Sequence, residues 1–217
     1  MEGKYNAAKI ALELVKDGMV LGIGSGTTVE IFLKLLGEKV KREGWEIYGV
    51  PSSYQSHLLA IENGIRVVDL VEYEPEICID GADQVDAKMN CIKGGGGAMT
   101  REKVVAMASR KVVIIVDESK LVEELSMPVP VEVLPFAYGY VSRELKDIAT
   151  KVVMRQGSGK IGPVITDNGN LIVDCDFGKI PDERVEEIEL KINRIPGVVE
   201  NGIFPKKIVD DVVVGRN

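Results

Sequence analysis

The chain has 217 residues, of which 45% are hydrophobic and 28% are charged, and its formal net charge is −7. These values are typical of a soluble globular protein with one large domain, or with one domain and a smaller companion, and they disfavour general binding to nucleic acid. The three cysteines lack a C-x-x-C spacing, charges interrupt the N-terminal segment, and no apolar run is long enough for a membrane span. We therefore predict a cytoplasmic protein without a membrane partner.

The first part of the sequence alternates between predicted helices and strands. Apolar residues recur at helical spacing from Ala7 to Val15, and this helix is expected to stop near Gly18. Strands are predicted at 19–23, 47–50, 64–68, 77–79 and 112–116, with helices at 28–42, 52–63 and 99–109 between them. This alternation predicts a doubly wound parallel sheet, in which ligands bind at the carboxyl edge of the strands.

The turn after the first strand is suited to bind a phosphate group. Its glycines let the backbone approach an anion, and the start of the following helix favours negative charge. Ser25, Thr27 and Thr28 add hydroxyl donors. A plain tight turn with a hydroxyl cap is the alternative. A dinucleotide is disfavoured, because Val29 occupies the third glycine position of G-x-G-x-x-G and no acid follows the 47–50 strand.

The composition changes in the second part of the chain. The proline-punctuated segment 127–135 is expected to cross between domains. A helix is predicted at 137–150, a strand at 151–155 and a flexible segment at 156–160. A hairpin turn at 167–169 then joins the segment 164–166 to a strand at 171–175, and a helix at 181–195 follows. This order, closed by residues 198–199, suggests a ferredoxin-like module. The apolar tail 208–215 is expected to return to the first sheet. We therefore predict a Rossmann-like domain of residues 1–127 with 203–217, and a smaller α+β domain of residues 128–202.

The stretch from Asp80 to Glu102 concentrates acids, a lysine and four consecutive glycines between a predicted strand and a predicted helix. Asp80, Asp83 and Asp86 suit a divalent metal site, simple turn formation, or acid–base work on sugar hydroxyls beside Lys93. The glycines favour a backbone that contacts an anion, because a purely structural turn does not require the entropy that they cost. Glu102, in the first turn of the helix, suits either a charge–dipole interaction or a general base.

These motifs resemble type A ribose-5-phosphate isomerase, in order and over nearly the whole chain. The resemblance rests on Gly-Ile-Gly-Ser-Gly-Thr-Thr (22–28), Asp-Gly-Ala-Asp (80–83), Ile-Lys-Gly-Gly-Gly-Gly-Ala (92–98), Thr-Arg-Glu-Lys (100–103), Val-Asp-Glu-Ser-Lys (116–120) and Pro-Val-Glu-Val-Leu-Pro (130–135). The chain departs from the pattern at Ser25 and Thr27, which exchange hydroxyl residues, and at Gln84, where an acid is common.

The resemblance implies an aldose–ketose isomerase, without metal or cofactor, that interconverts D-ribose 5-phosphate and D-ribulose 5-phosphate through a cis-enediolate. It implies that Glu102 moves a proton between C2 and C1, that Asp80 and Asp83 handle ring opening and the O1 and O2 protons, and that Lys93 stabilises the enediolate with the glycine backbone. A homodimer or homotetramer is implied as well. The implied substrate contacts are Lys4, Ser25, Gly26, Thr27, Thr28, Asp80, Gly81, Ala82, Asp83, Lys93, Gly94, Gly95, Gly96 and Lys120.

Two other functions are compatible with parts of the pattern. A sugar-phosphate sensor would keep the anion-binding turn without any chemistry, and Glu102 would then be replaceable without loss of ligand affinity. An acyl- or CoA-transferring enzyme would use a glutamate as nucleophile, but it gives no reason for the pairing of Asp80 with Asp83.

Overall fold

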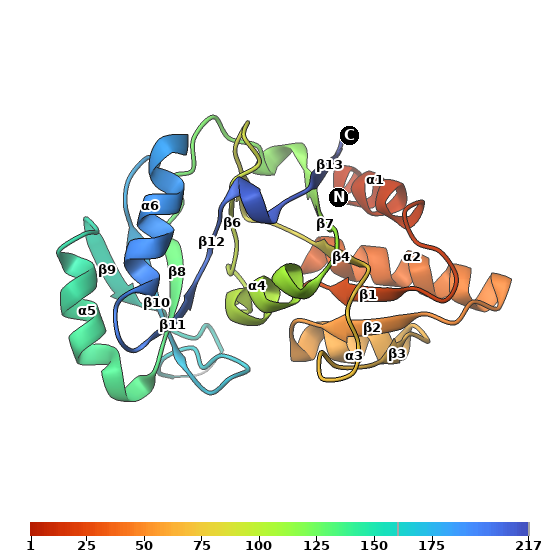
Figure 1. Ribbon diagram of the computed structural model, residues 1–217, viewed down its shortest axis with the longest axis horizontal. Helices are drawn as coiled ribbons and strands as arrows, with labels where there is room; N and C mark the ends of the chain where they lie inside the picture. Colours follow the sequence, from red (N-terminus) through yellow and green to blue (C-terminus); the bar gives the residue numbers. More distant parts are fainter. Residues whose placement is uncertain (160, 217) are drawn as a thin grey trace. The chain divides into compact units, whose positions relative to one another are not determined.

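The computed structural model describes residues 1–159 and 161–216 (Figure 1). Lys160, the last residue of the predicted flexible segment 156–160, lies outside the described residues. The chain divides into two compact units. Unit 1 comprises Met1–Ala82, Arg101–Leu121 and Lys207–Asn217, and unit 2 comprises Asp83–Thr100 and Val122–Lys206.

These units differ from the sequence-based division, which stays a prediction. Unit 2 contains residues 83–100, which the sequence-based division assigns to the Rossmann-like domain. It also contains residues 122–127 and 203–206, which the same division assigns to the Rossmann-like domain.

Unit 1 is built on a six-stranded sheet in which every pair of neighbours is parallel. Runs of β-branched residues explain the central strands, since such runs are typical of strands buried on both faces. The predicted parallel sheet is therefore confirmed, as is the return of the tail to it. In spatial order the strands are β13 (Asp211–Gly215), β7 (Val112–Asp117), β4 (Ile77–Asp80), β1 (Val20–Ile23), β2 (Tyr48–Pro51) and β3 (Arg66–Val67).

Helices cover both faces of this sheet. Leu21 and Ile23 of β1 belong to one core cluster with apolar residues of α1 and α2. Gly22 lies between them and faces the other way, where a Cβ atom would approach Val105 of α4 to 2.8 Å. The helices are α1 (Glu2–Leu12), α2 (Thr27–Glu43), α3 (Tyr54–Glu62) and α4 (Met99–Ala108), and α1 ends earlier than predicted because residues 13–15 form tight turns.

Unit 2 contains a four-stranded antiparallel sheet with the spatial order β11-β8-β10-β9. The chain order is strand, helix, strand, strand, helix, strand, so the predicted ferredoxin-like arrangement is confirmed. The elements are β8 (Val129–Val133), α5 (Tyr138–Lys146), β9 (Lys151–Met154), β10 (Leu171–Asp176), α6 (Asp182–Asn193) and β11 (Val198–Asn201) (Figure 1). Residues 164–166 are not a strand, and Ile165 makes only an isolated bridge to Leu171.

The prediction for segment 127–135 is wrong. Its residues 129–133 form β8, which is buried along its whole length and pairs with strands on both sides. Pro130 is tolerated because it lies near the beginning of β8, where the partner strand β11 ends at Asn201. The prolines mark the beginning of the strand and the residue after Leu134, and they do not mark a linker.

A three-stranded antiparallel sheet in unit 2 has no counterpart in the sequence-based prediction. It consists of β12 (Ile203–Phe204), β6 (Cys91–Ile92) and β5 (Gln84–Val85). Strands of two residues are too short for any periodicity to show. Within the described residues, no helix combines the length and apolar character that crossing a membrane requires.

Candidate active site

The loops that follow β1, β2, β4 and β7 lie at the same edge of the unit 1 sheet, because these strands are parallel. This edge collects the turn at residues 24–28, Ser52, Asp80 and Lys120, as the alternation of strands and helices predicts. The ends of neighbouring parallel strands form the usual location of a ligand site in such sheets.

Asp80 is fixed against the turn that follows β1. Asp80 is 1% exposed, and its Oδ1 accepts hydrogen bonds from the backbone N–H groups of Gly81, at 2.7 Å, and Ser25, at 3.1 Å. Gly24 must be glycine here, since a Cβ atom would lie 1.9 Å from Asp80 Oδ1. The carboxylate is therefore held in one orientation by the backbone of two loops.

The turn itself, residues 24–28, is stabilised by side chains from the loop after β2. The Ser25 hydroxyl contacts those of Ser52, at 2.9 Å, and Ser53, at 2.7 Å. Gly26, whose φ is 101°, donates its N–H to Gln55 Oε1 at 3.0 Å. Gln55 was not among the predicted site residues, although it lies in the Ser-Ser-x-Gln start of α3.

Two lysines lie at this edge as well. Lys4 Nζ donates a hydrogen bond to Thr27 Oγ1 at 2.9 Å. The pKa of Asp117 is lowered chiefly by a hydrogen bond from the Ser119 hydroxyl, and the charges of Lys4 and Lys120 also lower it. Both of these lysines, which are among the predicted substrate contacts, are thus close enough to the end of β7 to act on the same carboxylate. Thr28 lies in the first turn of α2, where unpaired N–H groups favour an anion.

Glu102 lies in the first turn of α4 and belongs to unit 1. Glu102 is only 5% exposed, and the neighbouring Lys103 is equally buried. A carboxylate placed only to interact with the helix dipole does not need to leave water, and burial of a charge carries a cost. The burial of Glu102 therefore favours the general-base interpretation of this residue.

Unit 2 carries Asp83 and Lys93 at the start of β5 and the end of β6, which are adjacent antiparallel strands. The Asp83 N–H donates to Ile92 O at 2.8 Å, so Asp83 and Lys93 face each other across the pair. Lys93 is 2% exposed, and its Nζ lies 5.3 Å from the centre of the Phe204 ring. The aromatic face is a favourable neighbour for the ammonium group.

The glycine-rich loop, Gly94–Gly97, follows Lys93. Gly94 and Gly97 have φ values of 91° and 84°, which favour glycine, and the Gly97 N–H donates to Gly94 O at 2.9 Å. Gly95 donates its N–H to Asp83 Oδ2 at 2.7 Å, and a Cβ atom here would lie 2.7 Å from Asp83 Oδ1. At Gly96, by contrast, no heavy atom of the described residues outside Gly95, Gly96 and Gly97 lies within 4 Å of a Cβ position. The internal structure of the loop thus explains three of its four glycines.

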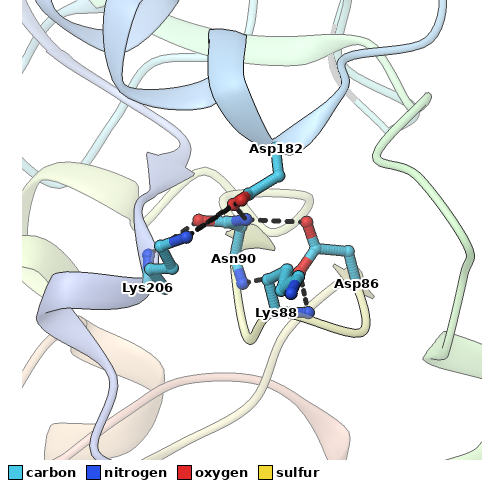
Figure 2. Close-up of polar contacts among 5 residues, drawn as sticks. All are labelled: Asp86, Lys88, Asn90, Asp182 and Lys206. Carbon is cyan, nitrogen blue, oxygen red and sulfur yellow. Dashed lines mark hydrogen bonds and ion pairs between the residues drawn. The ribbon is translucent and has the colours of Figure 1, made fainter.

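Asp86 has a structural role in the turn between β5 and β6 (Figure 2). Its Oδ1 accepts from the N–H groups of Lys88 and Asn90, both at 2.8 Å, and its Oδ2 accepts from Asn90 Nδ2 at 2.7 Å. Asn90 Nδ2 also donates to Asp182 Oδ1. The Asp182 carboxylate in turn forms an ion pair with Lys206, whose Nζ lies 2.9 Å from Oδ2. For Asp86 the structure supports turn formation among the three alternatives. Over residues 1–159 and 161–216, no three His, Cys, Asp or Glu side chains are grouped to hold a metal ion.

The side chain of Gln84, one of the departures from the motif pattern described above, binds backbone N–H groups. Its Oε1 accepts from the N–H groups of Ser126, at 2.8 Å, and Met127, at 2.9 Å. A carboxylate could accept the same two hydrogen bonds, so this departure from the pattern leaves the local structure intact. Sequence reasoning also missed Phe204, since nothing in its local pattern marks it as the neighbour of Lys93.

Comparisons with known proteins agree on one family. The model of ribose 5-phosphate isomerase A (phosphoriboisomerase A) matches residues 48–217. The ribose-5-phosphate isomerase A of Archaeoglobus fulgidus is 73% identical over 215 residues, which cover 99% of this chain and 96% of the relative. The solved ribose 5-phosphate isomerase A of Methanocaldococcus jannaschii superposes with a TM-score of 0.92 at 47% identity, over 98% of this chain and 93% of that one. Another solved D-ribose-5-phosphate isomerase, in complex with phospho-erythronic acid, gives 0.94 at 47% identity, over 99% and 94%. The chain belongs to the ribose 5-phosphate isomerase A family.

Proposed function

We propose that this chain interconverts D-ribose 5-phosphate and D-ribulose 5-phosphate, with the residues from Asp80 to Glu102 performing the proton transfers. Family membership supports the activity. The relative that binds phospho-erythronic acid supports a phosphorylated sugar as the ligand here. A carboxylate, like an enediolate, spreads negative charge over two oxygens in a plane, so this acid is also a suitable probe of the proposed site.

Glu102 is the proposed proton carrier. In the open-chain aldose it removes the C2 proton, and it returns that proton to C1 of the enediolate to give the ketose. The observation that carries this assignment is the burial of the Glu102 side chain in the first turn of α4. A correctly placed base contributes about 10²- to 10⁴-fold in rate.

Asp80 and Asp83 are proposed to open the sugar ring and to move the protons of O1 and O2. Only two residues separate them in the sequence. Each carboxylate already accepts backbone N–H groups, from Gly81 and Ser25 for Asp80 and from Gly95 for Asp83. Such hydrogen bonds orient a carboxylate before the substrate arrives, which supports a role in proton exchange with a bound hydroxyl group.

Lys93 and the glycine-rich loop are proposed to stabilise the negative charge of the enediolate. The ammonium group of Lys93 is buried, and Gly96 presents backbone without a described neighbour at its Cβ position. Fixed donors around a developing oxyanion contribute about 10²- to 10³-fold each. We further propose that Gly94, Gly95 and Gly96 contact the sugar through their backbone.

The phosphate is proposed to bind at the carboxyl edge of unit 1. The turn formed by Ser25, Gly26, Thr27 and Thr28 supplies N–H and hydroxyl donors at the start of α2, with Lys4 bonded to Thr27. Lys120, Gly81 and Ala82 are proposed to complete the substrate contacts from the neighbouring loops.

The assembly is proposed on the family resemblance, and the location and the absent partner classes are proposed on the composition and charge of the chain. We propose a homodimer or homotetramer in the cytoplasm, with the sugar phosphate as the partner and without nucleic-acid or membrane partners. The division into a catalytic domain of residues 1–127 with 203–217 and a smaller domain of residues 128–202 is likewise proposed. No metal or cofactor takes part in the proposed steps.

The test is ketose formation from ribose 5-phosphate by the purified protein in excess chelator, with Glu102→Gln measured beside it. Glu183→Gln is the matched control, because Glu183 also lies in the first turn of a helix, α6, but on the surface. We expect activity in the parent and the control, and a loss of about 10²-fold or more in Glu102→Gln.

The other outcomes separate the alternatives. Activity that disappears with chelator would indicate a metal ion in the reaction. Binding of ribose 5-phosphate without turnover by the parent protein would favour the sensor. Full activity of Glu102→Gln would refute the assignment of the base, while leaving the isomerase activity itself intact.

A further inference from the structure

Arg155 contacts the glycine-rich loop from the four-stranded sheet of unit 2. It directly follows β9, and its backbone N–H donates to Ile172 O of β10 at 2.9 Å. Its Nη1 donates to Gly94 O at 2.8 Å and to Gly95 O at 3.1 Å. One guanidinium nitrogen therefore binds two consecutive carbonyl groups of the loop.

Asp174 holds this guanidinium in place. Arg155 Nε donates to Asp174 Oδ2 at 2.8 Å, and Nη2 forms an ion pair with Oδ1. The two side chains are 18% and 26% exposed, so water screens the pair only in part. A two-pronged pairing of this kind fixes the plane of the guanidinium as well as its position.

The carbonyl contacts determine where the loop N–H groups point. In a trans peptide the C=O and the N–H point in opposite directions, and the chain has no cis peptide bond among its described residues. Because Gly95 O faces Arg155, the N–H of Gly96 faces away from it. Because Gly94 O faces Arg155, the N–H of Gly95 also faces away, toward Asp83 Oδ2. Two successive peptide planes are thus set by one side chain.

We propose that Arg155, held by Asp174, is a positioning residue for the reaction: it orients the peptide planes of the glycine-rich loop so that the Gly96 N–H faces the enediolate. The proposal rests on the isomerase function given above. It explains why a loop of four glycines, which is flexible by composition, can present a fixed donor. A donor helps the reaction only when it is already oriented toward the charge that develops.

A merely structural tie between the loop and the sheet is the competing explanation. The two explanations differ in what a substitution changes. A structural tie affects the folded fraction and so lowers activity and stability together. A positioning role lowers kcat and the affinity for a planar anion, while the binding of phosphate groups elsewhere changes little, so KM for ribose 5-phosphate changes much less than kcat.

The experiment compares Arg155→Met, Arg155→Lys and Asp174→Asn with the parent protein. Arg184→Met is the matched control, since Arg184 lies on α6 of the same unit in an exposed ion pair with Glu187. We expect Arg155→Met to lower kcat about 10- to 100-fold, the range for a misplacement of about 1 Å, with KM within about threefold of the parent value. Arg155→Lys keeps the positive charge but loses the planar guanidinium with its paired donors, and Asp174→Asn keeps the shape of the side chain but loses its charge. The kcat of both variants is therefore expected to lie between those of Arg155→Met and the parent protein.

Two binding measurements complete the design. Affinity for phospho-erythronic acid is expected to fall in step with kcat, and affinity for inorganic phosphate to stay unchanged. Amide hydrogen exchange of residues 92–99 is expected to become faster in Arg155→Met and Asp174→Asn, but not in the control.

Several results would overturn the role of Arg155. They are a kcat within about twofold of the parent value in Arg155→Met, or a loss of kcat matched by equal losses in phosphate affinity and thermal stability. If Arg155→Met does not fold, unchanged kcat and unchanged exchange in Asp174→Asn and Arg155→Lys overturn it. The absence of turnover in the parent protein would instead refute the proposed function, and this role with it.

Discussion

Alanine substitution in the glycine-rich loop separates a glycine that the fold requires from one that the substrate requires. Gly97 has a φ of 84°, and a Cβ atom there would lie 3.0 Å from Ile172 Cδ1. Placing alanine in a left-handed conformation costs about 1–2 kcal/mol, so we expect Gly97→Ala to lower the free energy of unfolding by about that amount.

Gly96 differs on both counts. It is not among the glycines with positive φ, and outside its two chain neighbours a Cβ atom would find no described heavy atom within 4 Å. Alanine there restricts the unfolded chain without strain in the folded one, so the free energy of unfolding is expected to stay equal or to rise by about 0.4–1 kcal/mol. If the Gly96 backbone contacts the enediolate, the added methyl group displaces the sugar, and kcat/KM is expected to fall about 10- to 100-fold.

The assay is urea unfolding together with initial rates of ketose formation for Gly96→Ala and Gly97→Ala. Gly139→Ala is the control, because Gly139 lies in α5 of the same unit and a Cβ atom would meet only the end of Arg143, at 4.0 Å. It is expected to keep full activity. A Gly96→Ala protein with parental stability and parental kcat/KM would refute the reasoning, since neither the fold nor the ligand would then explain why residue 96 is glycine.

Two further predictions concern polar networks within unit 2. Glu132 is fully buried in β8 and accepts from Thr166 Oγ1 at 2.8 Å and Asn170 Nδ2 at 2.7 Å. Glu132→Gln turns one acceptor into a donor and is expected to lower the free energy of unfolding in urea by about 1–3 kcal/mol; an unchanged value contradicts this. The pKa of Asp182 is lowered chiefly by the hydrogen bond from Asn90 (Figure 2). Its stabilising contribution is thus complete above the unfolded-state value of about 3.9 and is lost as pH falls through the lower folded-state pKa, so Asp182→Asn should flatten the pH dependence of stability there; a parallel profile would contradict this.

The parts of the fold that sequence patterns predicted are those in which one physical cause dominates. The run from Val112 to Val116 leaves little alternative to a strand buried on both faces, and alternation with amphipathic segments then leads to a parallel sheet. From that sheet it follows that Asp80 and the turn at residues 24–28 lie at one edge. The hydrogen bond from the Ser25 N–H to Asp80 is the direct result.

The missed parts depend on partners that are distant in the sequence. Pro130 reads locally as a break, yet it lies in the central strand β8. Pairing with β10 includes Pro130, and pairing with β11 stabilises the residues that follow it, so the strand forms despite its low local propensity. Arg155 reads as an ordinary charged residue after a strand. Its importance becomes visible only when Gly94 and Gly95, about 60 positions away, are seen to accept its hydrogen bonds. No local pattern encodes such a contact.

Two kinds of negative charge occur along the proposed reaction, and the chain is proposed to stabilise them in different ways. The phosphate charge is the same before, during and after the reaction, so the proposed phosphate site, which is the turn at residues 24–28 with its lysines, is expected to bind substrate and transition state about equally well. Uniform binding of that kind lowers KM and leaves kcat unchanged. The enediolate charge exists only along the reaction, so donors directed at it act on kcat. A loop that must present donors to a charge that is absent from the substrate cannot depend on the substrate to order it, and this is the physical reason for Arg155 and Asp174 to hold the backbone of the glycine-rich loop.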